Sequence, residues 1–575
     1  MTISFRSSAL IASVAFVLAG CAGSAHPGTM SPEGSYDVVI SGGKLVDGTG
    51  NSWFYGDVGL RGERIAIIAP VGTLADARAG KRIDAKGMVV APGFIDIQGQ
   101  SDEQLLTGDG RVISKVTQGV TTEILGEGDT PAPVNDKILA SFDSGDTSGV
   151  RVAKQFMGDR GFDAWLAAME KHGNSINVGS FIGAGTIREY ANGQAQGAPT
   201  EAQLDTMRRV TRDAMKDGAF GVASALIYPP GNYAGTHELS EIAKAIAPYH
   251  GVYISHIRSE GDSLLEALDE ALAIGRAGGV PVEIYHLKAA GHRAWAKAGE
   301  MIAKIDSARA AGQDVGATMY PYTASANGLA ACVPPWAAEN GKLLDNLKNP
   351  ETRARIISEA MDSTPGKPSY CQESGPGPIM VVGLLSTPSL AKYEGWRLDK
   401  IADDMHKSWG EAMADVVLTS GGRAGKVTFS MTDENVAMQL RRPWVVIGTD
   451  AEGFDPEGAK GLTHPRAYGS YPRLLGKYVR EEHVLTLEDA IRKFSSGVAE
   501  RLSIPDRGLL RAGMYADVVV FDPNTIIDRA TYEKPHQLSV GMREVFVNGV
   551  EVLRDGVHTG AKPGRALRGV GAGMK

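Results

Sequence analysis

The chain has 575 residues, of which 43% are hydrophobic and 22% charged, so it can bury a large core. This length predicts more than one domain, or one barrel with additional segments. The formal net charge of −8 lacks the basic character of nucleic-acid-binding proteins, which argues against nucleic acid as a partner.

The N-terminal segment has the pattern of a targeting sequence. An apolar stretch at residues 9–19 is too short to span a bilayer comfortably, and the Leu-Ala-Gly-Cys that ends at Cys21 resembles a bacterial lipoprotein box. Residues 1–21 are therefore interpreted as a lipoprotein signal peptide with Cys21 as the lipidated residue; the alternative is a cleaved signal peptide with an incidental cysteine. Residues 22–36 are small and polar, as expected of a tether. We expect an exported protein that is lipid-anchored in a bacterial cell envelope and faces the periplasm.

Both ends of the remaining chain predict short strands separated by turns. Residues 37–88 include "YDVVISGGKLVDGTG" and "GDVGLRGERIAIIAP", and residues 506–565 include "ADVVVFDP" and "REVFVNGVEVLRDG". Two β-rich pieces at opposite ends of a chain commonly pair with each other. We predict that they form one small β-sandwich domain.

Between these ends, residues 89–505 predict an α/β fold, specifically a (β/α)8 TIM-like barrel. Helical patterns such as "SLLEALDEALAIGRAG" alternate with apolar, strand-like segments. In such a barrel the chemistry is expected at the carboxyl ends of the strands. The eight predicted strand segments are residues 90–100, 119–128, 176–187, 218–226, 251–260, 280–288, 314–322 and 443–450.

The connection between the last two predicted strands, about residues 323–442, is too long for an ordinary loop. We predict that it forms an inserted lid subdomain over the mouth of the barrel. It contains Cys332 and Cys371, which in an oxidising compartment could form a disulfide; two buried free thiols are the alternative.

Two histidines lie where predicted strands meet polar residues. His256 occurs in "GVYISHIRSEG" and His286 in "VPVEIYHLKAAG", and imidazoles from neighbouring barrel strands can share one zinc ion. A third ligand is expected in "GVTTEILGEGDT", where Glu123 and Glu127 have the same strand parity. Glu127 is the better candidate because Glu123 would lie about 13 Å deeper along the strand.

The last predicted strand, "PWVVIGTDAEG", ends at Asp450. An isolated Gly-Thr-Asp also fits a capped turn, but at the eighth strand of a barrel with metal ligands Asp450 is a candidate general base. It could accept a proton from the attacking water and later donate it to the leaving amine.

A family resemblance covers nearly all of the chain that follows the targeting segment. The motifs "VAPGFIDI", "QGVTTEILGEG", "YISHIRSEGDSLLEALDEAL", "YHLKAAG", "MYPYTA", "GTDAEG" and "HPRAYGSYPRLL" occur in this order. This ordered set resembles the D-aminoacylases (N-acyl-D-amino-acid deacylases) of the amidohydrolase superfamily. The resemblance implies a zinc-dependent enzyme that cleaves the amide bond of an N-acyl-D-amino acid to give a carboxylate and a free amino acid.

The resemblance also implies roles for particular residues. Zinc ligands map to His256 and His286, and the catalytic aspartate maps to Asp450. In D-aminoacylases the third ligand is usually a cysteine, and here Glu127 occupies the corresponding place. The residues that bind the substrate carboxylate are similar to Lys288, Arg466 and a tyrosine of "YPY", with Tyr320 favoured over Tyr322.

The sequence departs from the family at the end of the first barrel strand. Family members usually carry His-x-His there, as part of a second metal position, whereas this chain has Gln98-Gly99-Gln100. An amide oxygen is a poorer transition-metal ligand than an imidazole, so we expect one zinc ion per chain. The amides could instead hydrogen-bond the attacking water or the acyl group of the substrate.

Two rival functions follow from the same residues. One keeps the chemistry and changes the substrate to a dipeptide or a peptidoglycan fragment. The other is a catalytically inactive, amidohydrolase-like binding protein that lost catalysis together with His-x-His. Retention of His256, His286, Lys288, Asp450 and Arg466 argues against the inactive protein, since a binder does not need Asp450.

Overall fold

A computed structural model describes residues 34–142, 146–364 and 370–574. The predicted signal peptide with Cys21, and the tether as far as residue 33, lie outside the described residues. Residues 35 and 36, which we assigned to the tether, instead begin the first β-strand, β1 (Ser35–Leu45). Within the described ranges, no helix has the length and apolar character needed to cross a membrane.

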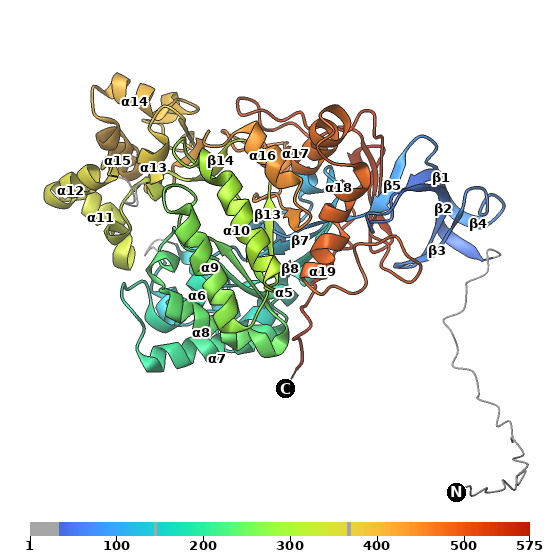
Figure 1. The fold of residues 1–575 in the computed structure, drawn as a ribbon, viewed down its shortest axis with the longest axis horizontal. Helices are drawn as coiled ribbons and strands as arrows, with labels where there is room; N and C mark the ends of the chain where they lie inside the picture. The colour runs from blue at the N-terminus through green and yellow to red at the C-terminus, as the bar shows by residue number, and fades with distance from the viewer. Residues whose placement is uncertain (1–33, 143–145, 365–369, 575) are drawn as a thin grey trace, which may run out of the picture.

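A parallel barrel occupies the centre of the molecule (Figure 1). Its strands form a three-stranded and a six-stranded parallel sheet, in which β8 and the short β9 (Ile182–Gly183) are two halves of one strand position. Nearly all of their residues are buried on both faces, which is the pattern of strands covered by helices. The eight positions are β6 (Phe94–Asp96), β7 (Val120–Leu125), β8 (Asn177–Ser180), β10 (Gly221–Ala225), β11 (Val252–His256), β12 (Val282–Ile284), β13 (Val315–Met319) and β17 (Val445–Ile447).

Backbone hydrogen bonds close the circle between the two sheets. At one junction the Phe181 amide donates to the Leu125 carbonyl at 3.0 Å. At the other, just beyond β17 and β6, the Asp450 amide donates to the Gln98 carbonyl at 2.8 Å and the Gln100 amide to the Ala451 carbonyl at 3.1 Å. The prediction of a (β/α)8 barrel is therefore confirmed, and its closure places Asp450 beside the glutamine pair.

Helices surround the barrel strands, as the alternating pattern predicted. Their apolar faces join the strands in one large hydrophobic core. Sequence signals set the ends of some of them: Thr200 and Gln203 form a capping box at the start of α7, and Gly218 ends it in a left-handed conformation. Surrounding helices include α5 (Gly161–His172), α7 (Glu201–Asp217), α8 (Thr236–Ile246), α9 (Leu264–Gly278), α10 (Ala298–Ala310), α16 (Asp433–Leu440), α18 (Leu487–Phe494) and α19 (Ser496–Arg501).

The two chain ends combine in a nine-stranded sheet beside the barrel. The junction is the antiparallel pairing of β5 with β18, which brings residues more than 400 positions apart into register. The strands are β1, β2 (Phe54–Arg61), β3 (Arg64–Pro70), β4 (Arg78–Asp84), β5 (Val89–Pro92), β18 (Val518–Phe521), β19 (Met542–Val547), β20 (Val550–Arg554) and β21 (Val557–His558).

The single strand predicted over residues 90–100 was wrong. It is divided at Gly93 into β5, which belongs to the terminal sheet, and β6, which belongs to the barrel. A side chain at Gly93 would collide with Thr121 of β7, so only glycine allows the chain to pass from one sheet to the other here. The continuous apolar run hid this division because both halves are buried.

The insertion forms a separate lobe with its own hydrophobic core. In Figure 1 its helices lie at the opposite side of the barrel from β1–β4. A disulfide joins Cys332 to Cys371, which decides between the two alternatives for these cysteines. The elements of the lobe include β14 (Ser325–Gly328), α11 (Leu343–Lys348), α12 (Pro350–Ala360), α13 (Tyr370–Ser374), β15 (Ile379–Val382), α14 (Leu398–Met405), α15 (Trp409–Thr419) and β16 (Gly425–Thr428).

Candidate metal centre and active site

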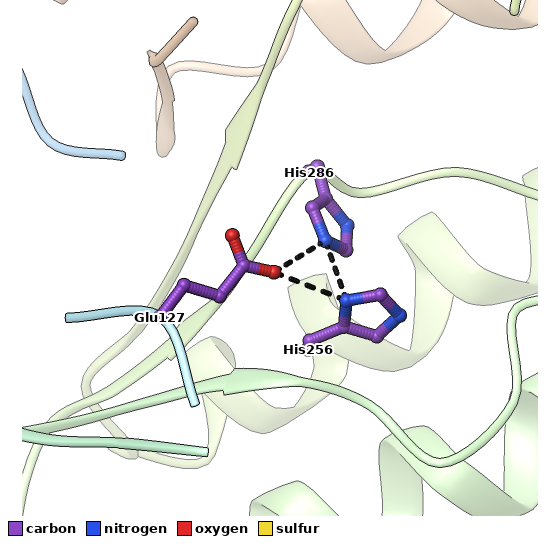
Figure 2. Close-up of side chains that lie close together, drawn as sticks. All are labelled: Glu127, His256 and His286. Carbon is purple, nitrogen blue, oxygen red and sulfur yellow. Dashed lines mark hydrogen bonds and ion pairs between the residues drawn. The ribbon is translucent and has the colours of Figure 1, made fainter. Parts of the chain in front are cut away.

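Three of the predicted ligand atoms meet at the mouth of the barrel. Glu127 Oε1 lies 3.1 Å from His256 Nδ1 and 3.0 Å from His286 Nε2, and the two nitrogens are 2.9 Å apart. Figure 2 shows the carboxylate and both rings pointing toward one another. Within the part of the chain that the structure describes, this is the one group of ligating side chains close enough to hold a metal ion.

The strands of the barrel position these ligands. His256 is the last residue of β11, and Glu127 and His286 lie two residues beyond β7 and β12. His286 has a φ of +34° and Asp450 a φ of +53°, in the left-handed region that L-residues with a side chain rarely adopt. Strained backbone of this kind persists where the surrounding structure imposes it, and here it occurs at two candidate site residues.

The donor set fits a zinc ion. Two imidazoles and one carboxylate are zinc ligands, and bonds of about 2.0–2.1 Å place the ligand atoms of a tetrahedral site about 3.3 Å apart. The three atoms form a triangle of nearly that size. Burial would raise the pKa of Glu127, but the positive charge of His286 and the hydrogen bond to His256 outweigh it and hold that pKa well below its ordinary value.

Glu260 belongs to this site although the sequence reasoning missed it. Its Oε1 lies 3.0 Å from His286 Nδ1 and 2.6 Å from Lys288 Nζ. Lys288 Nζ also lies 2.6 Å from His286 Nδ1, so Glu260 and Lys288 together contact the His286 nitrogen that is turned away from Glu127. Burial opposes ionisation of Glu260, but the Lys288 charge prevails and lowers its pKa. The available signal was its position four residues after His256, in "HIRSE".

The side chains of Gln98 and Gln100 form hydrogen bonds neither with each other nor with the ring nitrogens of His256 and His286. Both donate to carboxylates instead. Gln98 Nε2 donates to Glu127 Oε2 at 2.7 Å, and Gln100 Nε2 donates to Asp450 Oδ1 at 2.8 Å. Thr318 Oγ1 in turn donates to Gln98 Oε1 at 2.9 Å and accepts from the His286 amide. Both amides therefore take part in a hydrogen-bond chain within the protein, and their contacts to water or substrate stay a prediction.

The candidate base Asp450 has a second partner. Arg466 Nη1 lies 2.6 Å from Asp450 Oδ2, so one side of the carboxylate faces a guanidinium and the other faces the Gln100 amide. Burial raises the pKa of Asp450 to about 7, against the opposing charge of Arg466 and with a contribution from Glu127. A base that titrates near neutral pH suits proton transfer under physiological conditions.

Tyr320 lies between the two cationic side chains that the resemblance assigned to the substrate carboxylate. Its ring centroid is 4.7 Å from the Arg466 guanidinium carbon and 5.7 Å from Lys288 Nζ. The Tyr320 hydroxyl and Arg466 Nε are buried and have no hydrogen-bond partner among the described residues. Tyr322, the other candidate, instead donates to Asp528 Oδ2 at 3.2 Å, away from these groups.

A cavity of about 180 Å³ lies beside the three candidate metal ligands and reaches Lys288, Tyr320 and Asp450. The insertion closes one side of it through residues 325–327 of β14. Its lining includes Glu127, His256, His286, Gln100, Glu260, Lys288, Tyr320 and Asp450.

Beneath the cavity, a second buried charged cluster joins the first and last barrel strands. Lys115 Nζ donates to Asp96 Oδ2 at 2.7 Å and to the Ala451 carbonyl at 2.8 Å, and it lies 3.1 Å from Glu123 Oε1. Glu123, the alternative ligand that we set aside, is thus engaged below the site. A Cβ at Gly99 would lie 2.0 Å from the Glu123 carboxylate, which explains the glycine between the two glutamines.

A (β/α)8 barrel with a carboxylate and two imidazoles at its strand ends defines a metal-dependent hydrolase of the amidohydrolase class. The model of the amidohydrolase family matches residues 409–553. The N-acyl-D-glutamate deacylase of Alcaligenes xylosoxydans xylosoxydans is 34% identical over 92% of this chain and 96% of its own. The chain belongs to the D-aminoacylase family of N-acyl-D-amino-acid deacylases, as the sequence motifs indicated.

Two solved structures extend this comparison to the fold. N-acyl-D-glutamate deacylase from Bordetella bronchiseptica, in complex with zinc and a phosphonate mimic of the tetrahedral intermediate, is 31% identical with a TM-score of 0.74. A D-aminoacylase with a binuclear metal centre, for which one-metal activation and second-metal attenuation are described, is 29% identical with a TM-score of 0.73. Each covers 93% of this chain and 100% of its own.

Proposed function

We propose that this enzyme hydrolyses the amide bond of N-acyl-D-amino acids and releases a carboxylate and a free D-amino acid. The observation that carries the proposal is the convergence of Glu127, His256 and His286 in one cavity with Asp450. The family relationship agrees with this reaction.

Different residues of the chain take part in different steps of the hydrolysis. A zinc ion held by Glu127, His256 and His286 would polarise the amide carbonyl and lower the pKa of a water molecule. Asp450 accepts a proton from the attacking water as the new C–O bond forms, and it returns that proton to the nitrogen as the C–N bond breaks. Gln100 and Arg466 hold the two oxygens of Asp450 in place for both transfers.

The substrate carboxylate is held beside the metal by Tyr320, Arg466 and Lys288. The unpartnered Tyr320 hydroxyl and Arg466 Nε support this role, since buried donors without acceptors are costly unless a ligand supplies one. Lys288 contributes from its pair with Glu260. An apolar cavity of about 340 Å³ shares Tyr228 with the active-site cavity and provides space for an acyl group or an apolar side chain.

We further propose that one zinc ion per chain is sufficient. The support is the hydrogen bonding of Gln98 and Gln100, whose N–H groups face Glu127 and Asp450. An N–H group has no lone pair to offer a second cation, and it satisfies carboxylate oxygens that a second metal would otherwise bind.

We propose that the protein is exported and anchored through a lipid on Cys21, facing the periplasm. The apolar segment before Cys21 and the lipoprotein-like Leu-Ala-Gly-Cys support this location. The disulfide between Cys332 and Cys371 is consistent with it, because structural disulfides are typical of oxidising compartments.

The test is a substrate panel on the zinc-loaded protein that begins after Cys21. N-acyl D- and L-amino acids and dipeptides are assayed for the wild type and for Asp450→Asn. We expect hydrolysis of N-acyl-D-amino acids that is lost in the variant. Hydrolysis of L-substrates or dipeptides alone would overturn the substrate assignment, and binding without turnover in the wild type would identify an inactive binding protein.

A further inference from the structure

Lys426 is a buried cation that the mechanism above does not use. It lies on β16 of the insertion, is 3% exposed, and donates from Nζ to Thr428 Oγ1 at 3.1 Å. Among the described residues, no carboxylate lies within ion-pairing distance (4.0 Å) of its ammonium group. A buried charge is costly when no opposite charge accompanies it.

Lys426 differs from Lys288 and Arg466, the other two cationic side chains near the active-site cavity, because each of those has a carboxylate partner. Lys288 already has Glu260 at 2.6 Å, and Arg466 has Asp450 at 2.6 Å. Lys426 has only a neutral hydroxyl beside it, and burial lowers its pKa to about 8 even though the more distant Glu260 acts in the opposite direction. A bound anion would give Lys426 the partner that the protein itself does not provide.

Lys426 is also within reach of a substrate. It lines a cavity of about 290 Å³ together with Arg466, and this cavity shares Gln100, Asn327 and Asp450 with the active-site cavity. On the sheet of the insertion, Lys426 is paired directly with Asn327 of β14. A substrate whose carbonyl lies beside Glu127 can therefore extend past Asn327 toward Lys426.

We propose that Lys426 forms a subsite for a second carboxylate of the substrate, in addition to the one held by Tyr320 and Arg466. This inference rests on the proposed function and specifies its substrate class as N-acyl amino acids with two carboxylates. The second carboxylate could belong to an acidic amino-acid side chain or to a dicarboxylic acyl group, and the assay distinguishes the two.

The experiment compares N-acetyl-D-glutamate, N-succinyl-D-leucine and N-acetyl-D-leucine as substrates of the wild type and of Lys426→Met. We expect the wild type to prefer one of the two dicarboxylates. In Lys426→Met, kcat/KM for that substrate should fall by about 10- to 100-fold, mainly through KM, since a hydrogen bond to a charged group is lost. N-acetyl-D-leucine should change by less than about twofold, and Lys426→Arg should restore part of the loss.

Lys400→Met is the matched control because it removes an exposed lysine from the same lobe. An equal loss on all three substrates in Lys426→Met would show a structural role and overturn the subsite. The wild type is informative even if the variant does not fold: turnover of N-acetyl-D-leucine without preference for either dicarboxylate also overturns the subsite but leaves the proposed function intact. Failure to hydrolyse any of the three would instead count against the proposed function.

Discussion

Two neighbouring parts of the barrel rim present polar side chains of opposite character. Near the ends of β7, β11 and β12, a carboxylate oxygen of Glu127 and one ring nitrogen each of His256 and His286 point toward one another. Beyond β6, Gln98 and Gln100 turn N–H groups toward the carboxylates of that same site. One side thus offers ligand atoms for a cation, and the other provides hydrogen bonds at the position where the family resemblance implied a metal-binding His-x-His. The difference teaches that neighbouring positions of one barrel rim can present either ligand atoms or hydrogen-bond donors to the same site.

The largest effect is expected on the metal-binding side. His256→Ala and His286→Ala each remove one of three ligands, so zinc content after dialysis should fall from about one per chain to background, together with activity. Metal analysis and activity assays of the same samples measure this. His172→Ala, far from the ligands at the end of α5, should retain both. A zinc-replete His286→Ala enzyme would contradict the assigned centre.

Asp450 connects the two parts of the rim. It accepts a hydrogen bond from Gln100, and it would accept a proton from the water at the metal. Asp450→Asn should keep its zinc and lose about 10²–10⁴-fold in kcat, as expected when a general base is removed. Steady-state kinetics and metal content are the measurements. Full activity in this variant would exclude Asp450 as the base.

Gln100→Met tests the hydrogen-bonding side directly. Loss of a hydrogen bond to a charged group predicts a decrease in kcat of about 10- to 100-fold with little change in zinc content. The acid limb of the pH–rate profile should move to higher pH, because the lost N–H donor stabilised the ionised form of Asp450 and its removal raises that pKa. Gln104→Met, whose amide bonds to the exposed Glu452, serves as the control. An unchanged profile would show that Gln100 does not position the base.

A gain of metal rather than a loss is expected for the double variant Gln98→His with Gln100→His, which tests the comparison through metal content alone. Two imidazoles at these positions should raise the metal content after dialysis in excess zinc from about one toward two per chain. No gain would mean that the two amides do not stand at a vacated metal position.

Much of the fold followed from local patterns. Apolar runs that alternate with helical periodicity predicted the barrel, and the β-rich chain ends predicted a shared terminal domain that appears as one nine-stranded sheet. The division at Gly93 escaped this reasoning because β5 and β6 are equally buried, and hydrophobicity does not distinguish which sheet buries a strand.

The grouping of the candidate site residues was predictable to the same degree, and their roles stay predictions. Residues at strand ends were recognised because parallel strands bring their carboxyl ends together, and the closed barrel places Glu127, His256, His286 and Asp450 around one cavity. Glu260 was missed because the strand predicted over residues 251–260 ends at His256, and the loop that follows it brings Glu260 to His286.

The sequence by itself determined the class of fold, the family, and the chemical types of group available at each strand end. Tertiary structure alone decided which groups face one another: Lys288 pairs with Glu260, Arg466 with Asp450, and the two glutamine amides with the Glu127 and Asp450 carboxylates. The physical reason is that periodicity and hydrophobicity are local properties of a chain. Ion pairs and hydrogen bonds within a site instead depend on distances between residues up to 350 positions apart, which exist only once the barrel has closed.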